Sequence, residues 1–226
     1  MNKSGRGGWP FIAAGLLLLA CAAGLTAYNL YDNSRAGNEA DAVSQALAVQ
    51  IESRAALTRE LQTEQAAELA SDSPPAGQEA EASEEYREMA LETVDGNDYI
   101  GILEVPSMHL SLPVMYEWDE RRLKISPCRY AGSYYTDDLV ICAHNYRRHF
   151  SPLRSISTGA DVWLHTADGQ DIHYIAVNVE TIRPTAIEQM LDNDKNSDSE
   201  SSWDLTLFTC TIGGQARWTL RCERAD

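Results

Sequence analysis

Positive charge is scarce in this sequence. The 226 residues include 18 Lys and Arg against 34 Asp and Glu, which gives a formal net charge of −16 at pH 7. A protein that binds nucleic acid needs a basic face, so the composition argues against that class of partner. Residues 32–98 hold 16 acidic and 4 basic residues, whereas residues 99–226 hold 18 and 12. The first range therefore has the composition of a solvated linker.

Closely spaced cysteine pairs are also missing. No two of the five cysteines form a CxxC pair; they are Cys21, Cys128, Cys142, Cys210 and Cys222. This spacing supports neither a zinc knuckle nor a thioredoxin-like redox motif. A Cys128–Cys142 disulfide in an oxidising compartment and a pair of buried thiols both remain open.

The acidic stretch at residues 192–200 lacks the residues that define an EF-hand. That loop needs Gly at its sixth position and Glu at its twelfth, where this chain has Ser197 and Trp203. A solvated loop is the simpler interpretation, and a weak calcium site that orders the loop is the alternative. We predict neither a metal nor an organic cofactor.

The N-terminus carries an uncharged run at residues 7–31, preceded by Lys3 and Arg6. About 20 apolar residues cross a bilayer as a helix, and basic residues before them favour a cytoplasmic N-terminus. We predict that residues 1–31 form a cytoplasmic stub and membrane anchor, with the rest of the chain outside. A cleaved signal peptide is the alternative, because residues 18–21 (Leu-Leu-Ala-Cys) loosely resemble a lipoprotein processing box. The length of the apolar run favours the anchor.

Residues 32–98 are predicted to form an acidic stalk. Val43, Leu47 and Ile51 fall near helical spacing, which favours a marginal helix or a weak coiled coil. The low-complexity residues 71–85 are predicted to be disordered, and residues 84–94 to form a short helix. We expect the stalk to hold the domain away from the bilayer and to be dispensable for folding, because the strand pattern starts only at Tyr99.

From Tyr99 onward the sequence has the pattern of short strands. The predicted strands cover residues 100–105, 110–115, 138–143, 161–165, 172–182, 204–210 and 216–222. Short helical turns are predicted at residues 119–125 and 184–191. Many short strands and few helices favour a mainly β domain over residues 99–226, either a barrel or a sandwich with small helical insertions.

The candidate site is organised around the last two predicted strands, which are joined by Gly213-Gly214. If they pair as a hairpin, Cys210 ends the first strand beside Arg217 at the start of the second. A fixed positive charge favours the thiolate that attacks carbonyls, and a guanidinium can hydrogen-bond the resulting oxyanion. Arg221 shares that strand face but lies about 13 Å further along, so Arg217 takes the oxyanion role. The alternative is a structural cysteine beside a solvated arginine.

Among the five histidines, His144 has the most informative context. It follows a buried apolar strand and precedes Asn145, which places it in a loop at the edge of a sheet. A histidine near Cys210 can accept or donate the protons that nucleophilic catalysis requires. The sequence alone does not bring these two residues together. His149 belongs to an Arg-Arg-His cluster that is predicted to be exposed.

These residues resemble a known family. Residues 206–210 (Thr-Leu-Phe-Thr-Cys) match the Thr-Leu-x-Thr-Cys signature of sortases, with Arg217 a few residues later. Residues 143–145, followed by Phe150 and Leu153, are similar to the histidine segment of the same family. The resemblance covers roughly residues 98–224 and leaves the subclass open, because residue 143 is Ala where sortases often have Gly.

The resemblance implies an eight-stranded barrel and a membrane-anchored cysteine transpeptidase. Cys210 would attack the carbonyl after the Thr of an LPxTG-like sorting signal, His144 would move protons, and Arg217 would hold the oxyanion. The implied partners are surface-protein or pilin precursors that bear such a signal, and an amine acceptor such as a peptidoglycan precursor or a pilin lysine. The candidate substrate-binding residues are Phe208, Thr209 and Asn145.

Two other functions fit parts of the pattern. An L,D-transpeptidase of cell-wall peptides is also an external Cys/His enzyme, but it carries a Ser-His-Gly-Cys-type segment that residues 207–210 lack. A non-catalytic, membrane-anchored binding module would keep Cys210 and His144 as structural residues. Modification of Cys210 by a thiol reagent at neutral pH distinguishes the enzyme from the module, in which the thiol is inert.

Overall fold

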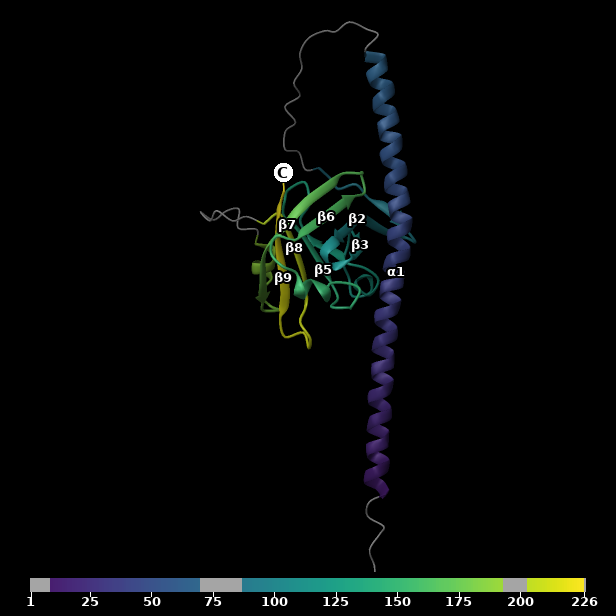
Figure 1. Ribbon diagram of the computed structural model, residues 1–226, viewed down its shortest axis with the longest axis vertical. Coiled ribbons are helices and arrows are strands. Elements are labelled where there is room, and N and C mark those ends of the chain that lie inside the picture. The colour runs from purple at the N-terminus through teal and green to yellow at the C-terminus, as the bar shows by residue number, and fades with distance from the viewer. Residues whose placement is uncertain (1–8, 70–86, 193–202, 226) are drawn as a thin grey trace, which may run out of the picture.

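The computed structural model describes residues 9–69, 87–192 and 203–225, as a long helix beside a β-barrel (Figure 1). The two α-helices are α1 (Trp9–Leu69) and α2 (Ile187–Leu191). The strands are β1 (Glu92–Val94), β2 (Asn97–Val105), β3 (Leu110–Met115), β4 (Cys128–Ala131), β5 (Leu139–Ala143), β6 (Asp161–Thr166), β7 (Asp171–Ile182), β8 (Leu205–Cys210) and β9 (Arg217–Arg224). The predicted helical turn at 119–125 is a 3₁₀ turn over Arg122–Lys124.

The sheet closes on itself. Its strand order is β1-β2-β3-β4-β5-β8-β9-β7-β6, and an additional pairing joins β6 back to β2. The ring therefore contains eight strands, with β1 outside it as an extra edge paired to β2. Most neighbours are antiparallel, but β3–β4 and β5–β8 are parallel. The predicted eight-stranded barrel is confirmed, and its closure leaves few open edges.

Every predicted strand of the domain is present, but the sequence analysis misses β1 and β4. The short helix predicted at residues 84–94 is wrong where the structure describes it, because Glu92–Val94 pairs with β2 through a hairpin turn at Asp95-Gly96. An Asp-Gly pair is a strong hairpin signal, so the sequence contained the information needed to predict this turn. Strand β4 has only four residues and mixes Arg with Cys and Tyr. It is too short to show the alternation of apolar and polar residues that identifies a strand.

Both faces of the central strands are buried. On β5, Leu139 and Ile141 pack into one hydrophobic cluster, and Val140 and Cys142 pack into a second cluster on the opposite face. This explains why the strand is a continuous apolar run rather than an alternating one. The second cluster also contains Phe208 at the candidate site and two side chains of α1.

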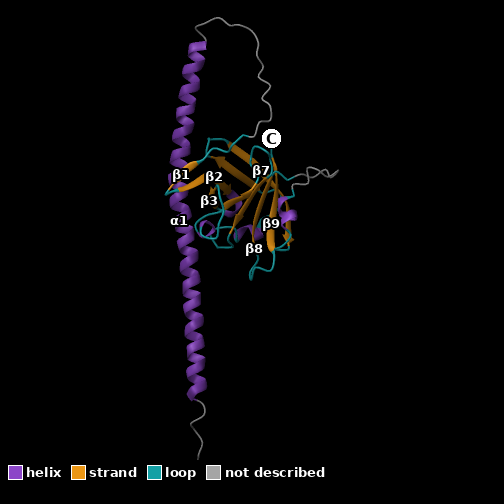
Figure 2. Cartoon of the chain, turned by 180° about the vertical axis from the view of Figure 1, so that it is seen from behind, coloured by secondary structure: helices purple, strands orange, loops and turns teal. Residues whose placement is uncertain are grey.

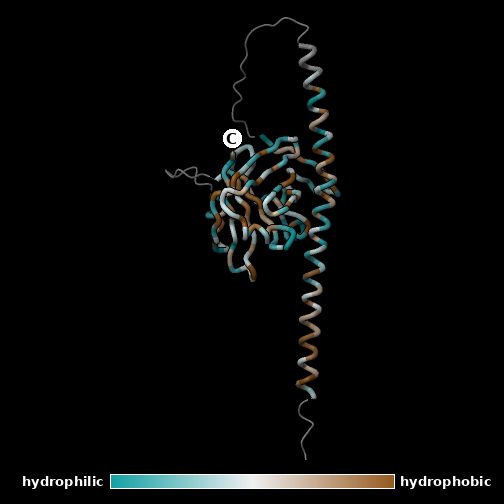
Figure 3. The backbone as a smooth tube through the Cα atoms, in the orientation of Figure 1, coloured by the Kyte–Doolittle hydropathy of each residue, from teal (hydrophilic) through white to brown (hydrophobic). Residues whose placement is uncertain are grey.

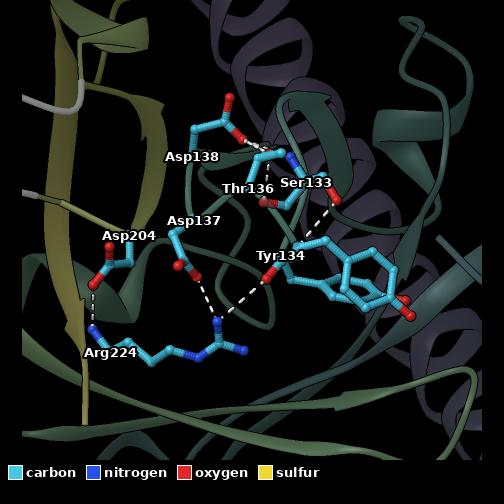
Figure 4. A network of polar contacts seen from close by, with 8 residues as sticks. Ser133, Tyr134, Thr136, Asp137, Asp138, Asp204 and Arg224 are labelled. Atoms are coloured by element: carbon cyan, nitrogen blue, oxygen red, sulfur yellow. Dashed lines mark hydrogen bonds and ion pairs between the residues drawn. The ribbon is translucent and has the colours of Figure 1, made fainter. Parts of the chain in front are cut away.

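A network of polar contacts fastens the end of the barrel away from Cys210 (Figure 4). The backbone N–H of Arg224 donates to Asp204 Oδ2 at 2.7 Å, just before β8 begins. The guanidinium of the same arginine binds the carboxylate of Asp137 and the carbonyl of Tyr134 in the β4–β5 connection. The ends of β8 and β9 are thereby fixed to the connection that precedes β5.

Helix α1 is one continuous element of 61 residues, or about 90 Å. Its N-terminal half is apolar and exposed, with side chains such as Phe11 at 78% and Leu18 at 71% exposure. It is long and apolar enough to cross a membrane, which agrees with the predicted anchor. Figure 3 shows this apolar half extending beyond the barrel at one end, whereas the middle of the helix runs alongside it.

Part of the predicted stalk packs on the domain, a contact that the sequence analysis did not predict. Helix α1 packs against β1, β2 and β3 along one side of the barrel (Figure 2). Val43 and Leu47, from the predicted apolar stripe, are buried in the second hydrophobic cluster. An ion pair between Arg54 and Glu92 joins the helix to β1. Part of residues 32–98 is therefore packed on the barrel as a structural element.

Candidate active site

The predicted hairpin is present, and Cys210 lies directly opposite Arg217 in the β8–β9 register. The connecting turn is closed by a hydrogen bond from Thr211 N–H to the carbonyl of Ala216 at 2.9 Å. Gly213 and Gly214 both adopt left-handed φ angles, 82° and 69°, which other residues adopt only with strain. The glycine pair thus sets the turn that brings the thiol beside the guanidinium.

A different pairing brings His144 to the same place. Strands β5 and β8 run parallel, with Ala143 beside Thr209, so the residues that follow each partner emerge at the same edge of the barrel. The Thr209 hydroxyl donates to the carbonyl of Ala143 at 2.8 Å and locks this register. His144 directly follows β5, and Cys210 is the last residue of β8. The sequence predicted both residues, but only this long-range pairing brings them together.

One cleft of about 280 Å³ is lined by Cys210, His144 and Arg217 together. Cys210 and His144 are half-buried, as is Arg217, so all three are partly accessible from the cleft. The walls also include Trp118, Glu120, Tyr130, Ile187, Met190 and Phe208. The structure thus joins the predicted nucleophile, proton carrier and oxyanion partner in one concave site.

The cleft has an aromatic wall that the sequence analysis did not predict. The Tyr130 ring lies 5.2 Å from the Phe208 ring, edge to face, and 5.2 Å from the Trp118 ring. Trp118 is 45% exposed at the mouth of the cleft. The connection between β3 and β4 supplies Trp118 and Glu120, and nothing in their spacing along the chain indicates that they reach the cleft.

The three predicted substrate-binding residues differ in position. Phe208 and Thr209 line the cleft but are buried, at 7% and 1% exposure, and the Thr209 hydroxyl is already bonded to β5. Asn145 follows His144 and is half-buried, but it is not among the residues that line the cleft. Their role in binding substrate stays a prediction.

His144 carries the electrostatic features of a proton carrier. Burial lowers its pKa below the ordinary value of 6.5, while the carboxylates of Glu120 and Asp32 act in the opposite direction. Its Nε2 atom is buried and has no hydrogen-bond partner among the described residues. No described group occupies this nitrogen, which is compatible with the predicted role of His144 in proton transfer.

The cleft contains two thiols, of which only one suits nucleophilic attack. Cys142 is 4% exposed, and burial raises its pKa to about 12, so it is protonated at neutral pH. Cys210 is half-buried beside Arg217. Cys128 lies directly across from Cys142 on β4, and both are free thiols in this structure.

Arg221 lies on the same strand face as Arg217, as the sequence predicts, but it is not among the residues that line the cleft. Its side chain is 3% exposed and forms an ion pair with Glu180 at 2.7 Å. It also donates to the Thr206 hydroxyl and to carbonyls at the C-terminal end of α2, including that of Met190. Arg221 therefore holds α2, which supplies one wall of the cleft.

A larger hollow of about 610 Å³ lies between α1 and the barrel. None of the three predicted catalytic residues lines it. His165 at its edge contacts Asp171 at 2.6 Å and Glu104 at 3.1 Å. No cysteine is among the described residues that line this hollow, so the predicted thiol chemistry points to the smaller cleft.

Residues 193–202 lie outside the described part of the chain, so the calcium hypothesis for the acidic loop stays untested there. Within the described ranges, no group of three or more His, Cys, Asp or Glu side chains is arranged to hold a metal ion. The cleft is lined by the thiol of Cys210, the imidazole of His144 and the guanidinium of Arg217.

Comparison with known proteins identifies the family. The family model for the sortase domain matches residues 103–225. The chain belongs to the sortase family. A sortase domain implies a cysteine transpeptidase, and the match covers the strands that carry His144, Cys210 and Arg217. No curated protein matches the chain.

Several solved sortase structures are similar to this one. Sortase C from Clostridium perfringens SM101 is 23% identical, with 57% of this chain and 71% of that chain covered and a TM-score of 0.45. Sortase A from Corynebacterium diphtheriae is 18% identical, with 57% and 62% covered and a TM-score of 0.49. Sortase C1 from Streptococcus suis is 24% identical, with 57% and 73% covered and a TM-score of 0.46.

Proposed function

We propose that this sortase is a membrane-anchored transpeptidase that cleaves an LPxTG-like sorting signal and transfers the protein to an amine. The observation that carries the proposal is the single cleft lined by Cys210, His144 and Arg217 within a sortase domain. The aromatic wall beside these residues offers an apolar surface for an extended peptide.

The first half-reaction forms a thioester. The Cys210 thiolate attacks the carbonyl carbon after the Thr of the sorting signal, forming a C–S bond and a tetrahedral oxyanion. Arg217, opposite Cys210 in the hairpin, donates hydrogen bonds to that oxyanion. The C–N bond then breaks, and His144 gives its proton to the departing amine.

The second half-reaction reverses these roles. An amine enters the cleft and attacks the thioester carbon, while His144 removes a proton from the attacking nitrogen. The C–S bond breaks, Cys210 leaves as thiolate, and an amide remains. The pair returns to thiolate and imidazolium, so neither a metal nor an organic cofactor takes part in the cycle.

The proposed location follows from the N-terminal helix. Lys3 and Arg6 precede its apolar half, so we place the N-terminus in the cytoplasm and the barrel outside the cell membrane. The substrates are then surface-protein or pilin precursors with a C-terminal sorting signal. The acceptor is an amine such as that of a peptidoglycan precursor or a pilin lysine.

A transpeptidation assay tests this function. The full chain in detergent micelles is incubated with a panel of LPxTG-like peptides and an amine acceptor, and the products are identified by mass spectrometry. We expect a new amide after the Thr with the wild type and none with Cys210→Ala. Cys142→Ser is the matched control and should keep activity. Equal activity of wild type and Cys210→Ala would overturn the proposal.

A further inference from the structure

The loop that carries His144 is bound to α1 immediately after its apolar half. This docking segment, residues 32–41 of α1, contains Ala36 and Ala40, both fully buried. Gly37 between them has no room for a side chain, because an added Cβ would overlap the side chain of Arg148. Small residues at these positions let the helix backbone approach the loop closely. The packing is thus specific to these three positions of the helix.

Three successive residues of the loop form polar contacts with the docking segment. The Tyr146 hydroxyl donates to Asp32 Oδ2 at 2.7 Å, and the next backbone N–H, of Arg147, donates to Asn33 Oδ1 at 3.0 Å. Arg148 donates to Asn38 Oδ1 at 2.9 Å and forms an ion pair with Asp41. These contacts follow one another along both the loop and the helix.

Tyr146 connects this interface to His144. Its ring centroid lies 5.0 Å from that of His144 and 5.3 Å from that of His149, which is fully buried. The hydroxyl of Tyr146 is held by Asp32, so the ring that flanks the catalytic imidazole cannot swing away without breaking a hydrogen bond. Contrary to the exposure predicted from the basic cluster, His149 fills the interior of this loop.

We propose that the docking segment of α1 positions His144 for proton transfer, with Asp32 and Tyr146 as positioning residues. The proposal rests on the proposed transpeptidase function. Figures 1 and 2 show the β8–β9 hairpin pointing toward the N-terminal end of α1. The same helix that anchors the protein therefore supports the reactive end of the barrel.

A double-mutant cycle in the full chain in detergent micelles tests the link. Asp32→Ala removes the acceptor of the hydrogen bond, and Tyr146→Phe removes its donor while keeping the ring. We expect each to lower kcat for a sorting peptide by ~10-fold with little change in KM, and the double variant to be no worse than either single one. Glu60→Gln, an exposed carboxylate on the same helix, is the matched control and should behave as wild type.

The pH profile separates positioning from a general loss of structure. The charged and titratable groups around His144 are Glu120, Lys124, Asp32, Tyr146 and His149, together with Cys210 and Arg217 in the same cleft. Because Asp32 favours the imidazolium, Asp32→Ala should move the limb of the kcat profile that His144 controls to lower pH, and Glu60→Gln should not move it. If the Asp32 and Tyr146 variants match Glu60→Gln, or if their losses are additive, the proposal is wrong.

A second measurement does not depend on the peptide. The rate at which iodoacetamide alkylates Cys210 is followed against pH in the same variants. We expect Asp32→Ala and Tyr146→Phe to change this profile, and the control to leave it unchanged. If wild type cleaves no peptide but the alkylation profiles change as expected, the transpeptidase function fails while the positioning of His144 stands. Unchanged profiles in both variants would overturn the positioning role.

Discussion

At the scale of single residues, two arginines on strand β9 differ in their burial and in their contacts. Arg217 is half-buried in the cleft opposite Cys210, whereas Arg221 is buried among Glu180, Thr206 and the end of α2. Strand periodicity places both on one face and cannot tell them apart. The contacts of the two guanidinium groups distinguish them: Arg217, the proposed oxyanion partner, lines the cleft, and Arg221 holds α2.

Lysine substitutions at the two sites should therefore affect different properties: activity at Arg217 and stability at Arg221. Arg217→Lys keeps the charge but loses the planar fork, and should lower kcat/KM by roughly 10²- to 10³-fold with Tm unchanged. Arg221→Lys leaves buried acceptors without donors and should cost roughly 2–4 kcal/mol of stability. Its effect on kcat per folded molecule should be small. Peptide kinetics and thermal unfolding of both variants check this, and the reverse pattern would contradict it.

His149 should make stability depend on pH. Burial lowers its pKa to about 4, below the 6.5 of an unfolded chain, so the unfolded state binds more protons between these values. Stability is then lost as pH falls from about 6.5 toward 4. Between pH 7 and 5, urea unfolding should show wild type losing about 1–2 kcal/mol more than His149→Leu. His109→Leu, at an exposed site, should lose as much as wild type; equal losses in all three would contradict this account.

At the scale of elements, the sequence identifies the strands better than their partners. The hairpin of β8 and β9 is a local feature, so alternation and a glycine pair were enough to place Cys210 beside Arg217. The proximity of His144 depends on a parallel pairing between β5 and β8, which lie about 60 residues apart in the sequence. Local periodicity carries no information about such a pairing.

The docking of α1 was missed for a different reason. Its buried face begins with Ala36 and Ala40, and alanines do not stand out in an alanine-rich stretch. Val43 and Leu47 continue the same face, but their spacing alone also fits a weak coiled coil. The partner of an amphipathic stripe becomes clear only when the barrel surface is known.

Packing of α1 on the barrel should be measurable as stability. Leu47→Ala removes a fully buried side chain and should cost roughly 2–3 kcal/mol, which thermal unfolding of the full chain in micelles can detect. Leu57→Ala on the same helix is the matched control, because that side chain is 57% exposed, and should change stability by less than about 0.5 kcal/mol. Equal effects of the two substitutions would show that α1 does not pack on the barrel in solution.

At the scale of the whole molecule, one helix serves as both the proposed anchor and a support for the domain. Its apolar half is exposed, and the middle of the helix lies along the barrel (Figure 3). In the proposed orientation, the substrate signal and the acceptor meet the enzyme on the outer side of the membrane. This arrangement predicts that the reactive thiol is accessible from outside the cell.

Labelling in intact cells checks the orientation. A membrane-impermeant maleimide should modify Cys210 in wild type, and the label should be lost in Cys210→Ser. An added cysteine at Ser4, before the apolar half, should react only after the membrane is permeabilised. Labelling of the Ser4→Cys site in intact cells, with Cys210 protected, would contradict the proposed topology and indicate the opposite orientation.

The central claim is that Cys210 forms a thioester with the sorting signal. Intact-mass spectrometry of the full chain, incubated with a sorting peptide and no amine acceptor, tests it most directly. The account predicts an added mass equal to the acyl part of the peptide, mapped to Cys210 and absent in Cys210→Ala. Cleavage of the peptide without this adduct in rapidly quenched samples, or an adduct mapped to Cys142, would contradict it.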